Sequence, residues 1–468
     1  MRTLVLTLML LGVAACAGDG GGGGGGSGSG LPEVTALAAT QGDMQLTLSW
    51  TNPTFAEFAG VEVRRDTAAA PAQVTDGVQV YVGVGSGATD SGLTNGVRYH
   101  YTAFVQESGG KYSAGVSISA VPNPSGPVQI TFAGVGGGGG SHGIFDPSLA
   151  TDPLSGRIWM SYSEVLDSAM WPGQNIWIQT RLAYSDDAGL TWTDSGNVIN
   201  AAQDVTLPLA PPNNAGTWVH EVSTLVRDPY APASERWKLM WHRYLLVNGV
   251  RAFDHGWIAL RSAPDPSGTW SAERKLFVGS IYDTADNVII GPPEVQLDQL
   301  HADLNSAVVF SEPGLLVNSS GLYVSILAAD GTVAAGRVIL VRLPTGGSTW
   351  EYRGSFLVSS TDGPALGYDG LSAPALYQQD GGYNLIVTPQ TASFYEGTLL
   401  FRITDLDAAT IERSGGVPQA FFTHFGTSGS FNGASTYVPE ATASGLIYCE
   451  VQTVAPLVFE MYASRRNP

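Results

Sequence analysis

Charged side chains are scarce in this 468-residue chain: they make up 13% of it, and 22 basic residues stand against 41 acidic ones. The formal net charge at pH 7 is therefore −19. Phosphate recognition depends on clustered lysine and arginine, so most of this surface would repel a nucleic-acid backbone. We expect no nucleic-acid partner.

Cysteine is nearly absent, and the one strongly apolar run near the start is short. Residues 4–13 form this run behind Met1-Arg2, too short to span a bilayer, and small residues follow it. The segment has the pattern of an export signal. Val13-Ala14-Ala15-Cys16 resembles the bacterial lipobox, which implies lipidation of Cys16; the alternative is an ordinary signal with a chance cysteine. Cys449 is the other cysteine, so we expect no intramolecular disulfide and a buried thiol.

The residues behind Cys16 are almost all glycine and serine, a composition that buries nothing and behaves as a flexible chain. We interpret residues 1–16 as a lipoprotein signal peptide and 17–30 as a tether. The expected protein is exported, bound to the bacterial cell envelope through its lipid, and monomeric.

Helix-forming patterns are rare. The chain holds 59 glycines and 27 prolines, which resist helix interiors, while short runs rich in Val, Ile, Thr, Tyr and Trp recur throughout. This pattern predicts an all-β protein.

Residues 31–122 contain strand-like runs at short spacing, separated by turn residues. They are residues 45–50, 60–65, 78–82, 98–106 and 112–120. The segment resembles a fibronectin type III domain: Trp50 stands where that family has its core tryptophan, and Leu93 to Tyr99 match the turn and tyrosine that brace the sandwich corner. Residues 123–127, Asn-Pro-Ser-Gly-Pro, read as a linker.

Residues 128–468 contain a repeated unit. Five segments open with a short phrase, continue through a turn into a second strand, and in four cases reach a third strand; the phrases begin at Asp146, Glu221, Glu312, Ser372 and Asn432. This is the strand order of a propeller blade, whose first strand lines the central channel. We predict a five-bladed β-propeller, closed by Val128–Phe132 as the last strand of the final blade. Four and six blades are the alternatives.

One turn motif lies within the first unit. The segment that begins at Ser185 fits the Asp-box pattern of sialidases at every fixed position: Ser185, Asp187, Gly189, Thr191 and Trp192. We expect a structural hairpin turn, in which the aspartate accepts backbone N–H groups and glycine adopts a left-handed conformation.

Three of the five phrases open with an acidic residue: Asp146, Glu221 and Glu312. If the first strands line the channel, these carboxyls converge. Carboxylates in a low dielectric raise one another's pKa, which suits a general acid, while a partner that stays ionised serves as base or nucleophile. This division of labour is typical of glycosidic bond cleavage.

The propeller segment resembles five-bladed glycoside hydrolases such as arabinanases, β-xylosidases and invertase-like fructosidases. Asp146-Pro147 looks like the opening of their first blade, which implies that Asp146 is base or nucleophile. Glu312-Pro313 stands where they have the general acid. The second position departs from the family, which has aspartate where this chain offers Glu221; we prefer Glu221 to Asp228, which aligns with a turn.

The expected function is a glycoside hydrolase acting on a poly- or oligosaccharide. Two alternatives stay open: a noncatalytic glycan- or protein-binding propeller, and a sialidase-like exo-glycosidase that would use arginines such as Arg243, Arg342 and Arg402. Candidate sugar contacts are His142, His220, Arg243, Trp171 and Trp177.

No zinc-ligand spacing is present, so we expect no metal and no cofactor. A calcium ion bound by channel carboxylates is the alternative.

Overall fold

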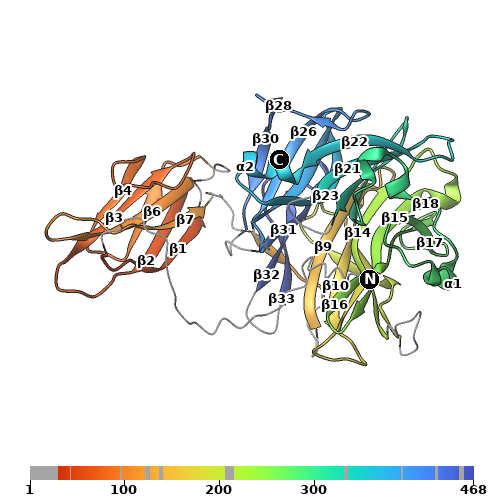
Figure 1. Cartoon of the computed structure of the whole chain (residues 1–468), viewed down its shortest axis with the longest axis horizontal. Helices are drawn as coiled ribbons and strands as arrows, with labels where there is room; N and C mark the ends of the chain where they lie inside the picture. Colours follow the sequence, from red (N-terminus) through yellow and green to blue (C-terminus); the bar gives the residue numbers. More distant parts are fainter. Residues whose placement is uncertain are drawn as a thin grey trace. The chain divides into compact units, whose positions relative to one another are not determined.

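The computed structural model describes residues 30–42, 44–94, 97, 99–120, 122, 127–135, 141–205, 215–330, 336–391, 394–426, 431–452 and 458–468. The export signal, Cys16, nearly all of the tether and most of the linker lie outside these residues. The described chain is almost entirely β-structure and divides into two compact units (Figure 1). None of its helices is long and apolar enough to cross a membrane.

The first unit is a sandwich of a three-stranded and a four-stranded sheet. Trp50 lies in its core at 4% exposure, and the hydroxyl of Tyr99 accepts a hydrogen bond from the Thr94 N–H at 3.0 Å. One sheet has the order β1-β2-β5 and the other β4-β3-β6-β7, with bounds β1 Thr35–Gly42, β2 Gln45–Thr51, β3 Phe58–Asp66, β4 Val78–Gly83, β5 Gly87–Ser91, β6 Tyr99–Glu107 and β7 Val116–Ala120. The fibronectin type III assignment remains a prediction that this arrangement suits.

The second unit is a ring of five blades. In the described residues each blade has four main antiparallel strands, given from the channel outward. Blade 1 is β9 Ser141–Thr151, β10 Ile158–Asp167, β11 Ile176–Ser185 and β12 Thr193–Asn200; blade 2 is β14 Gly216–Arg227, β15 Trp237–Val247, β16 Val250–Ala263 and β17 Arg274–Val278; blade 3 is β19 Val309–Asn318, β20 Gly321–Ala329, β21 Arg337–Pro344 and β22 Glu351–Val358; blade 4 is β23 Gly370–Gln379, β24 Gly382–Thr391, β26 Thr398–Asp405 and β27 Thr410–Ile411; blade 5 is β31 Asn432–Thr436, β32 Ile447–Gln452, β33 Val458–Ala463 and β8 Val128–Ile130.

Short elements decorate the ring. These short strands and helices extend the edges of blades or lie in the connections between strands. They are β13 Gln203–Val205, β18 Val295–Gln296, β25 Phe394–Tyr395, β28 Arg413–Ser414, β29 Val417–Pro418, β30 Ala420–His424, α1 Asn287–Ile290, α2 Ser359–Leu366, and the 3₁₀ helices η1 Ala233–Glu235, η2 Thr284–Asp286, η3 Leu297–Gln299 and η4 Ala302–Leu304.

The prediction of five blades is confirmed, and so is the closing strand. β8 pairs with β33 through Ile130 and Met461, so the two ends of this segment share blade 5. Apolar side chains fill the spaces between blades; Trp218, Trp241 and Trp257 of blade 2, for example, share a cluster with Trp159 of blade 1. Burial between twisted sheets thus holds the ring together.

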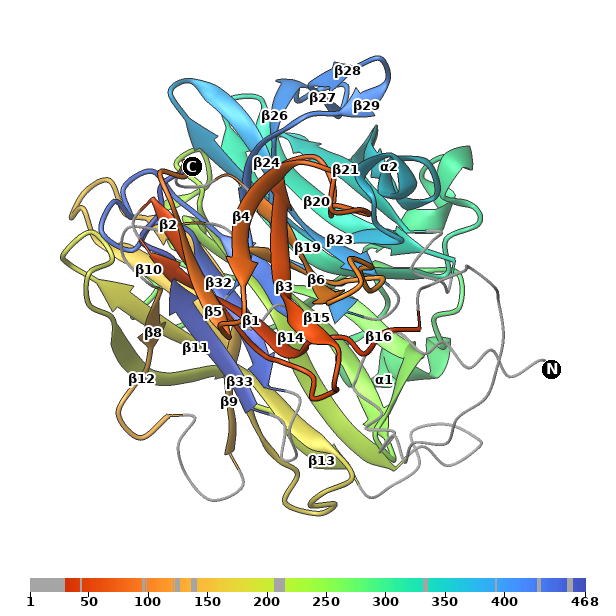
Figure 2. The same ribbon diagram turned by 90° about the vertical axis from the view of Figure 1, so that its left-hand side faces the viewer.

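Blades 5 and 1 also meet through the backbone. β33 lies beside β9, with Phe459 paired to Gly143 (Figure 2). Gly143 has φ +105°, and a Cβ there would come within 1.9 Å of the Phe459 carbonyl oxygen. We expect Gly143→Ala to lower the free energy of unfolding by about 2 kcal/mol or more, because the added methyl group forces the two blades apart. Urea denaturation would measure this loss; Gly156→Ala, at an open left-handed turn, controls for the cost of the φ angle alone.

Candidate active site

A bulge interrupts every inner strand at the same level of the channel. The pairing of β9, β14, β19, β23 and β31 with its neighbour breaks there, and one non-glycine residue adopts positive φ. These five residues are Asp146 (51°), Val222 (52°), Glu312 (55°), Ala373 (46°) and Ala434 (47°). A left-handed conformation is costly for such residues, above all for a β-branched valine, so this recurrence marks a position that the ring imposes.

The bulges correct the blade register expected from sequence. Asp146 and Glu312 are equivalent, as predicted. The equivalent residue of blade 2 is Val222, one position after Glu221, and those of blades 4 and 5 are Ala373 and Ala434 rather than Ser372 and Asn432. The first acidic or small residue of each sequence phrase predicts one set of equivalent positions. The bulge residues with positive φ define the equivalent positions in the structure.

Hydroxyl groups two positions after the bulges fasten neighbouring inner strands. Ser148 accepts from the Leu225 N–H at 3.2 Å, Thr224 from the Leu315 N–H at 3.1 Å, and Thr436 from the Leu149 N–H at 3.1 Å. These bonds cross from blade to blade. They fix the strands that carry the acidic residues, which reduces the conformational freedom of the site.

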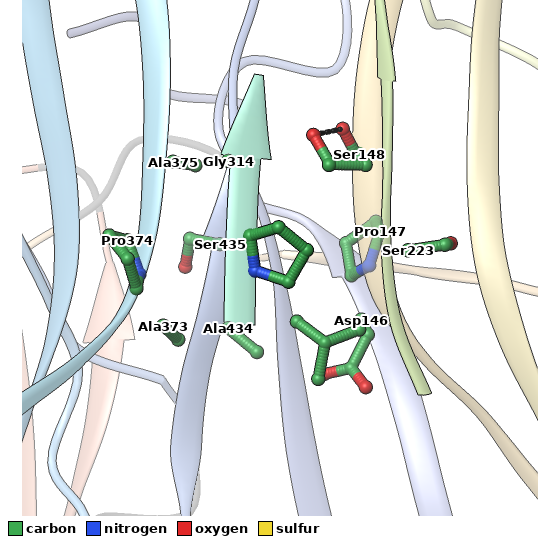
Figure 3. A pocket seen from close by; sticks show the side chains of 13 residues that line it. Asp146, Pro147, Ser148, Ser223, Gly314, Ala373, Pro374, Ala375, Ala434 and Ser435 are labelled. Carbon is green, nitrogen blue, oxygen red and sulfur yellow. Dashed lines mark hydrogen bonds between the residues drawn. The ribbon is translucent and has the colours of Figure 1, made fainter. Parts of the chain in front are cut away.

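A small cavity runs along the axis beside the bulges. Figure 3 shows three tiers of lining residues, which include three prolines and three alanines. From one end to the other the labelled tiers are Asp146, Ala373 and Ala434; then Pro147, Pro374, Ser435 and Ser223; then Ser148, Gly314 and Ala375. Asp146 therefore borders a poorly solvated space.

Asp146 is buried, at 7% exposure. The Val222 N–H donates a hydrogen bond to its carboxyl group, while Oδ2 is buried without a hydrogen-bond partner among the described residues. Burial, followed by the negative charges of Glu221 and Glu312, raises the pKa of Asp146 well above its usual value. The three predicted carboxyls are therefore close enough to act on one another.

Glu312 has the second perturbed carboxyl. Its Oε2 accepts a hydrogen bond from the Ala373 N–H at 2.7 Å, and the Tyr395 hydroxyl donates to the same carboxyl group. Burial raises the pKa of Glu312 to about 7, and the negative charge of Glu221 adds to the rise; the two donors and the positive charge of Arg251 act in the opposite direction. An acid with this pKa is half-protonated at neutral pH, as a general acid requires.

Glu221 is held as one half of an ion pair. Its Oε1 accepts from the Arg251 guanidinium at 3.0 Å, and its Oε2 accepts from the Tyr244 hydroxyl at 2.5 Å. Arg251 comes from β16 and packs over Tyr244 and Phe253, 5.1 and 5.9 Å from their ring centroids. This arrangement keeps a negative charge next to Asp146 and Glu312, and it brings a positive charge to the same cluster.

Three functional candidates were missed in the sequence: Arg251, Tyr244 and Tyr395. None belongs to an inner strand. Arg251 and Tyr244 flank the turn between β15 and β16, and Tyr395 lies on the two-residue strand β25. The sequence offers no signal for them beyond the residue types, because only the packed blade brings them to the carboxyls.

Asp228 lies where the sequence placed it, at the turn between β14 and β15. Its Oδ1 accepts from the Tyr230 N–H at 3.0 Å, and its Oδ2 lies 3.5 Å from the Lys238 amine. This turn-capping role supports the choice of Glu221 over Asp228 for blade 2.

Two predicted sugar contacts have other partners. His220 is 5% exposed and accepts from the Trp241 indole N–H at 2.9 Å; burial lowers its pKa well below the usual value. Arg243 is paired with Glu273 at 2.9 Å and packs over the rings of Trp218 and Trp257. Both side chains are held in the interior of blade 2, and their contact with sugar remains a prediction.

The remaining predicted contacts lie on blade 1. His142, at the start of β9, is 3.0 Å from Asp167 through its Nε2. Trp171 lies in the turn between β10 and β11, and Trp177 follows on β11; both are partly exposed. Their contact with sugar remains a prediction.

The turn between β11 and β12 contains the Asp-box residues. Asp187 accepts from the Thr191 N–H at 2.9 Å and from the Ser185 hydroxyl at 2.8 Å, and Gly189 has φ +84°. Trp192 packs against the apolar cluster between blades 5 and 1. The turn is a structural element and carries no part of the carboxyl cluster.

The arginines proposed for a sialidase-type cluster do not come together. Arg243 is paired with Glu273, and Arg342 is paired with Glu351 and Asp407, each at 2.7 Å. Arg402 packs over Phe421. The cation beside the carboxyls is instead Arg251.

Cys449 is buried, as predicted, and burial raises the pKa of its thiol well above the usual value. Within the part of the chain that the structure describes, no group of three His, Cys, Asp or Glu side chains is arranged to hold a metal ion.

No protein-family model matches the chain, and no curated protein matches it. The chain is distantly similar to several solved structures. They include the Hadza microbial sialidase Hz136 (11% identity, 89% of this chain and 82% of that chain, TM-score 0.40), an exo-1,5-α-L-arabinanase from a bovine ruminal metagenomic library (10%, 82% and 97%, 0.37), and a family 117 glycoside hydrolase from the marine bacterium Zobellia galactanivorans (14%, 72% and 88%, 0.39). At this similarity the function has to be argued from the site.

Proposed function

We propose that this protein is a glycoside hydrolase whose reaction centre is the carboxyl cluster of the propeller channel. The observation that carries the proposal is the pair Asp146 and Glu312: equivalent bulge residues, both buried, both with raised pKa. Two neighbouring carboxyls, one of which is protonated while the other is ionised, are what acid-assisted glycosidic cleavage requires.

In the proposed mechanism Glu312 donates its proton to the oxygen of the scissile bond, so that the leaving sugar departs as an alcohol. Asp146 acts in its ionised form, either by taking a proton from the attacking water or by attacking the anomeric carbon itself. Protonation of Glu312 removes one of the negative charges that raise the pKa of Asp146. Positive charge that develops on the sugar ring then favours the Asp146 carboxylate further.

Glu221 and Arg251 orient this pair. The negative charge of Glu221 lies beside both acids and raises their pKa. The positive charge of Arg251 partly offsets the negative charge of the cluster. Glu221 thereby keeps a proton on the pair near neutral pH, and Arg251 limits the size of the effect.

The location of the propeller at the cell envelope is also proposed. Lipidation at Cys16 would anchor the protein in the bacterial cell envelope, with the glycine-rich segment as tether and the sandwich unit as a fibronectin type III spacer. The substrate would be a poly- or oligosaccharide near the cell surface.

Asp146→Asn tests the proposal on a panel of polysaccharides and aryl glycosides. We expect the wild-type protein to release reducing sugar and Asp146→Asn to lose at least about 10²-fold in rate, because the amide can act neither as base nor as nucleophile. Asp152→Asn is the matched control: Asp152 also precedes a proline in blade 1, but it caps a turn through the Leu154 N–H. Glycan binding without product release by the wild type would favour the noncatalytic propeller.

A further inference from the structure

We propose that a file of hydrogen-bonded internal water molecules lies between blades 1 and 2 and connects the axial cavity beside Asp146 with the outer edge of blade 1. The buried polar side chains between these two blades carry the inference. The water file itself is independent of catalysis; only its use, as the source of the water that glycosidic cleavage consumes, rests on the proposed function.

Three buried polar residues lie side by side across blade 1. Ser163 of β10 is paired with Thr180 of β11, and Thr180 is paired with Asn200, the last residue of β12. Residues directly opposite on neighbouring strands project from the same face of a sheet, about 5 Å apart. All three are buried, and the two hydroxyls and the whole Asn200 amide have no hydrogen-bond partner among the described residues.

Two further serines continue this polar set toward the axis. Ser161 lies two residues before Ser163 on the same face of β10, and it is paired with Ser148 of β9, which lines the axial cavity. Ser223 of blade 2 lines the same cavity. The hydroxyls of Ser161 and Ser223 are buried, and in the described part of the chain they too have no partner.

This face of blade 1 packs against blade 2. The same alternation along β10 presents Trp159 and Val165 on either side of the serines, and each belongs to an apolar cluster that includes side chains of blade 2. The Leu225 N–H of blade 2 also donates to the Ser148 hydroxyl at 3.2 Å. The polar set is therefore enclosed between two apolar layers, and it ends at β12, where the next residue, Ala201, is exposed.

Water is the partner that fits these groups. Buried hydroxyls and amides are almost always hydrogen-bonded, and five unpaired ones would remove a large part of the net stability of a domain. An internal water molecule bonds to about three such groups. The axial cavity has a volume of about 30 Å³, which is room for about two water molecules.

The polar set is specific to blades 1 and 2. In blade 3 the buried Ser325 hydroxyl donates to the Gly314 carbonyl at 3.3 Å. In blade 4 the Ser372 hydroxyl accepts from the Gln390 amide at 2.8 Å. Among the described residues, every serine, threonine and asparagine side chain that is buried without a partner belongs to blade 1 or blade 2.

A supply of water from inside the ring has a use during hydrolysis. Each cleaved bond consumes one water molecule: its oxygen joins the anomeric carbon, one proton stays on that oxygen, and the other restores the proton that the carboxyl pair gave to the leaving sugar. A polysaccharide bound over the mouth of the channel excludes bulk water from that side. The water file would then supply the site from between the blades.

A crystal structure of the full chain, at a resolution that shows ordered water, tests the inference. We expect density peaks within about 3 Å of the Ser163, Thr180 and Asn200 side chains. The peaks should continue past Ser161 to the axial cavity. Thr180→Val keeps the shape of the side chain and removes the hydroxyl, so the peak beside it should be lost. Ser325→Ala is the matched control, because it removes an equally buried hydroxyl that a carbonyl already satisfies.

No peak beside Ser163 and Thr180, or a file that stops before the cavity, would overturn the inference, and the wild type alone decides this if the variant does not fold. Kinetics test the use of the water. Thr180→Val should lower kcat more on a long polysaccharide than on a short aryl glycoside, and equal effects on both would contradict that use. A complete file in a protein that hydrolyses nothing would support the water site and contradict the proposed function.

Discussion

Glu312→Gln should reduce glycoside hydrolysis by about 10²- to 10⁴-fold, because the amide has the shape of the acid and no proton to give. Its position should be preserved, since the amide oxygen can still accept from the Ala373 N–H. Rates on the best substrate of the panel measure the loss, and Glu235→Gln, at an exposed position of η1, is the control.

The same substitution should stabilise the protein above neutral pH. In the folded protein the pKa of Glu312 is raised to about 7, above its ordinary value of 4.5. The folded state therefore binds more protons between these values, and the free energy of unfolding falls as pH rises through this window. Glu312→Gln removes this penalty, which amounts to at most about 3 kcal/mol. Melting curves at pH 5 and pH 8 check the sign. A variant that loses activity and is equally destabilised at both pH values would point to misfolding instead of a lost acid.

Arg251→Met should produce the largest loss of stability. Methionine keeps apolar packing against Tyr244 and Phe253 but leaves Glu221 buried beside two further carboxyls without its cation. Breaking a buried ion pair by removing one partner costs about 3–5 kcal/mol. The loss should grow as pH rises through about 7, where Glu312 ionises and repulsion in the cluster increases.

A double-mutant cycle separates this effect from lost packing. In Arg251→Met with Glu221→Gln the uncompensated charge is gone, so part of the stability should return. Urea denaturation at pH 8 gives the four free energies of unfolding. Additive losses would show that Arg251 stabilises the protein by packing alone and that the ion pair does not govern the cluster.

The propeller architecture could be predicted from the sequence because the inner strands of each blade come from one short, contiguous stretch of the chain. A strand rich in β-branched and aromatic residues, a turn and a second strand recur in each unit, and the ring closes with Val128–Ile130 because an unpaired edge strand needs a partner. In the sandwich, the sequence did not predict β1 and β5, because these strands are rich in alanine, threonine and glycine and lack the usual strand pattern.

The site was accessible only in part, for physical reasons. Asp146 and Glu312 were found because each precedes a proline at the start of a repeated phrase. The left-handed backbone of Val222 leaves no trace in its residue type, so Glu221 was placed one position out of register. His220 directly precedes Glu221, but alternation along the strand turns its side chain, with that of its cross-strand partner Arg243, toward the interior of blade 2.

The most direct test of the central claim is the hydrolysis rate of the double variant Asp146→Asn with Glu312→Gln, compared with both single variants and the wild type. Residues that act as one catalytic unit are strongly non-additive. We predict that the double variant is no slower than the slower single variant, because either substitution already disables the pair. Losses that multiply, or a wild-type protein that releases no sugar from any glycan on the panel, would contradict the assignment of Asp146 and Glu312 as a cooperating pair.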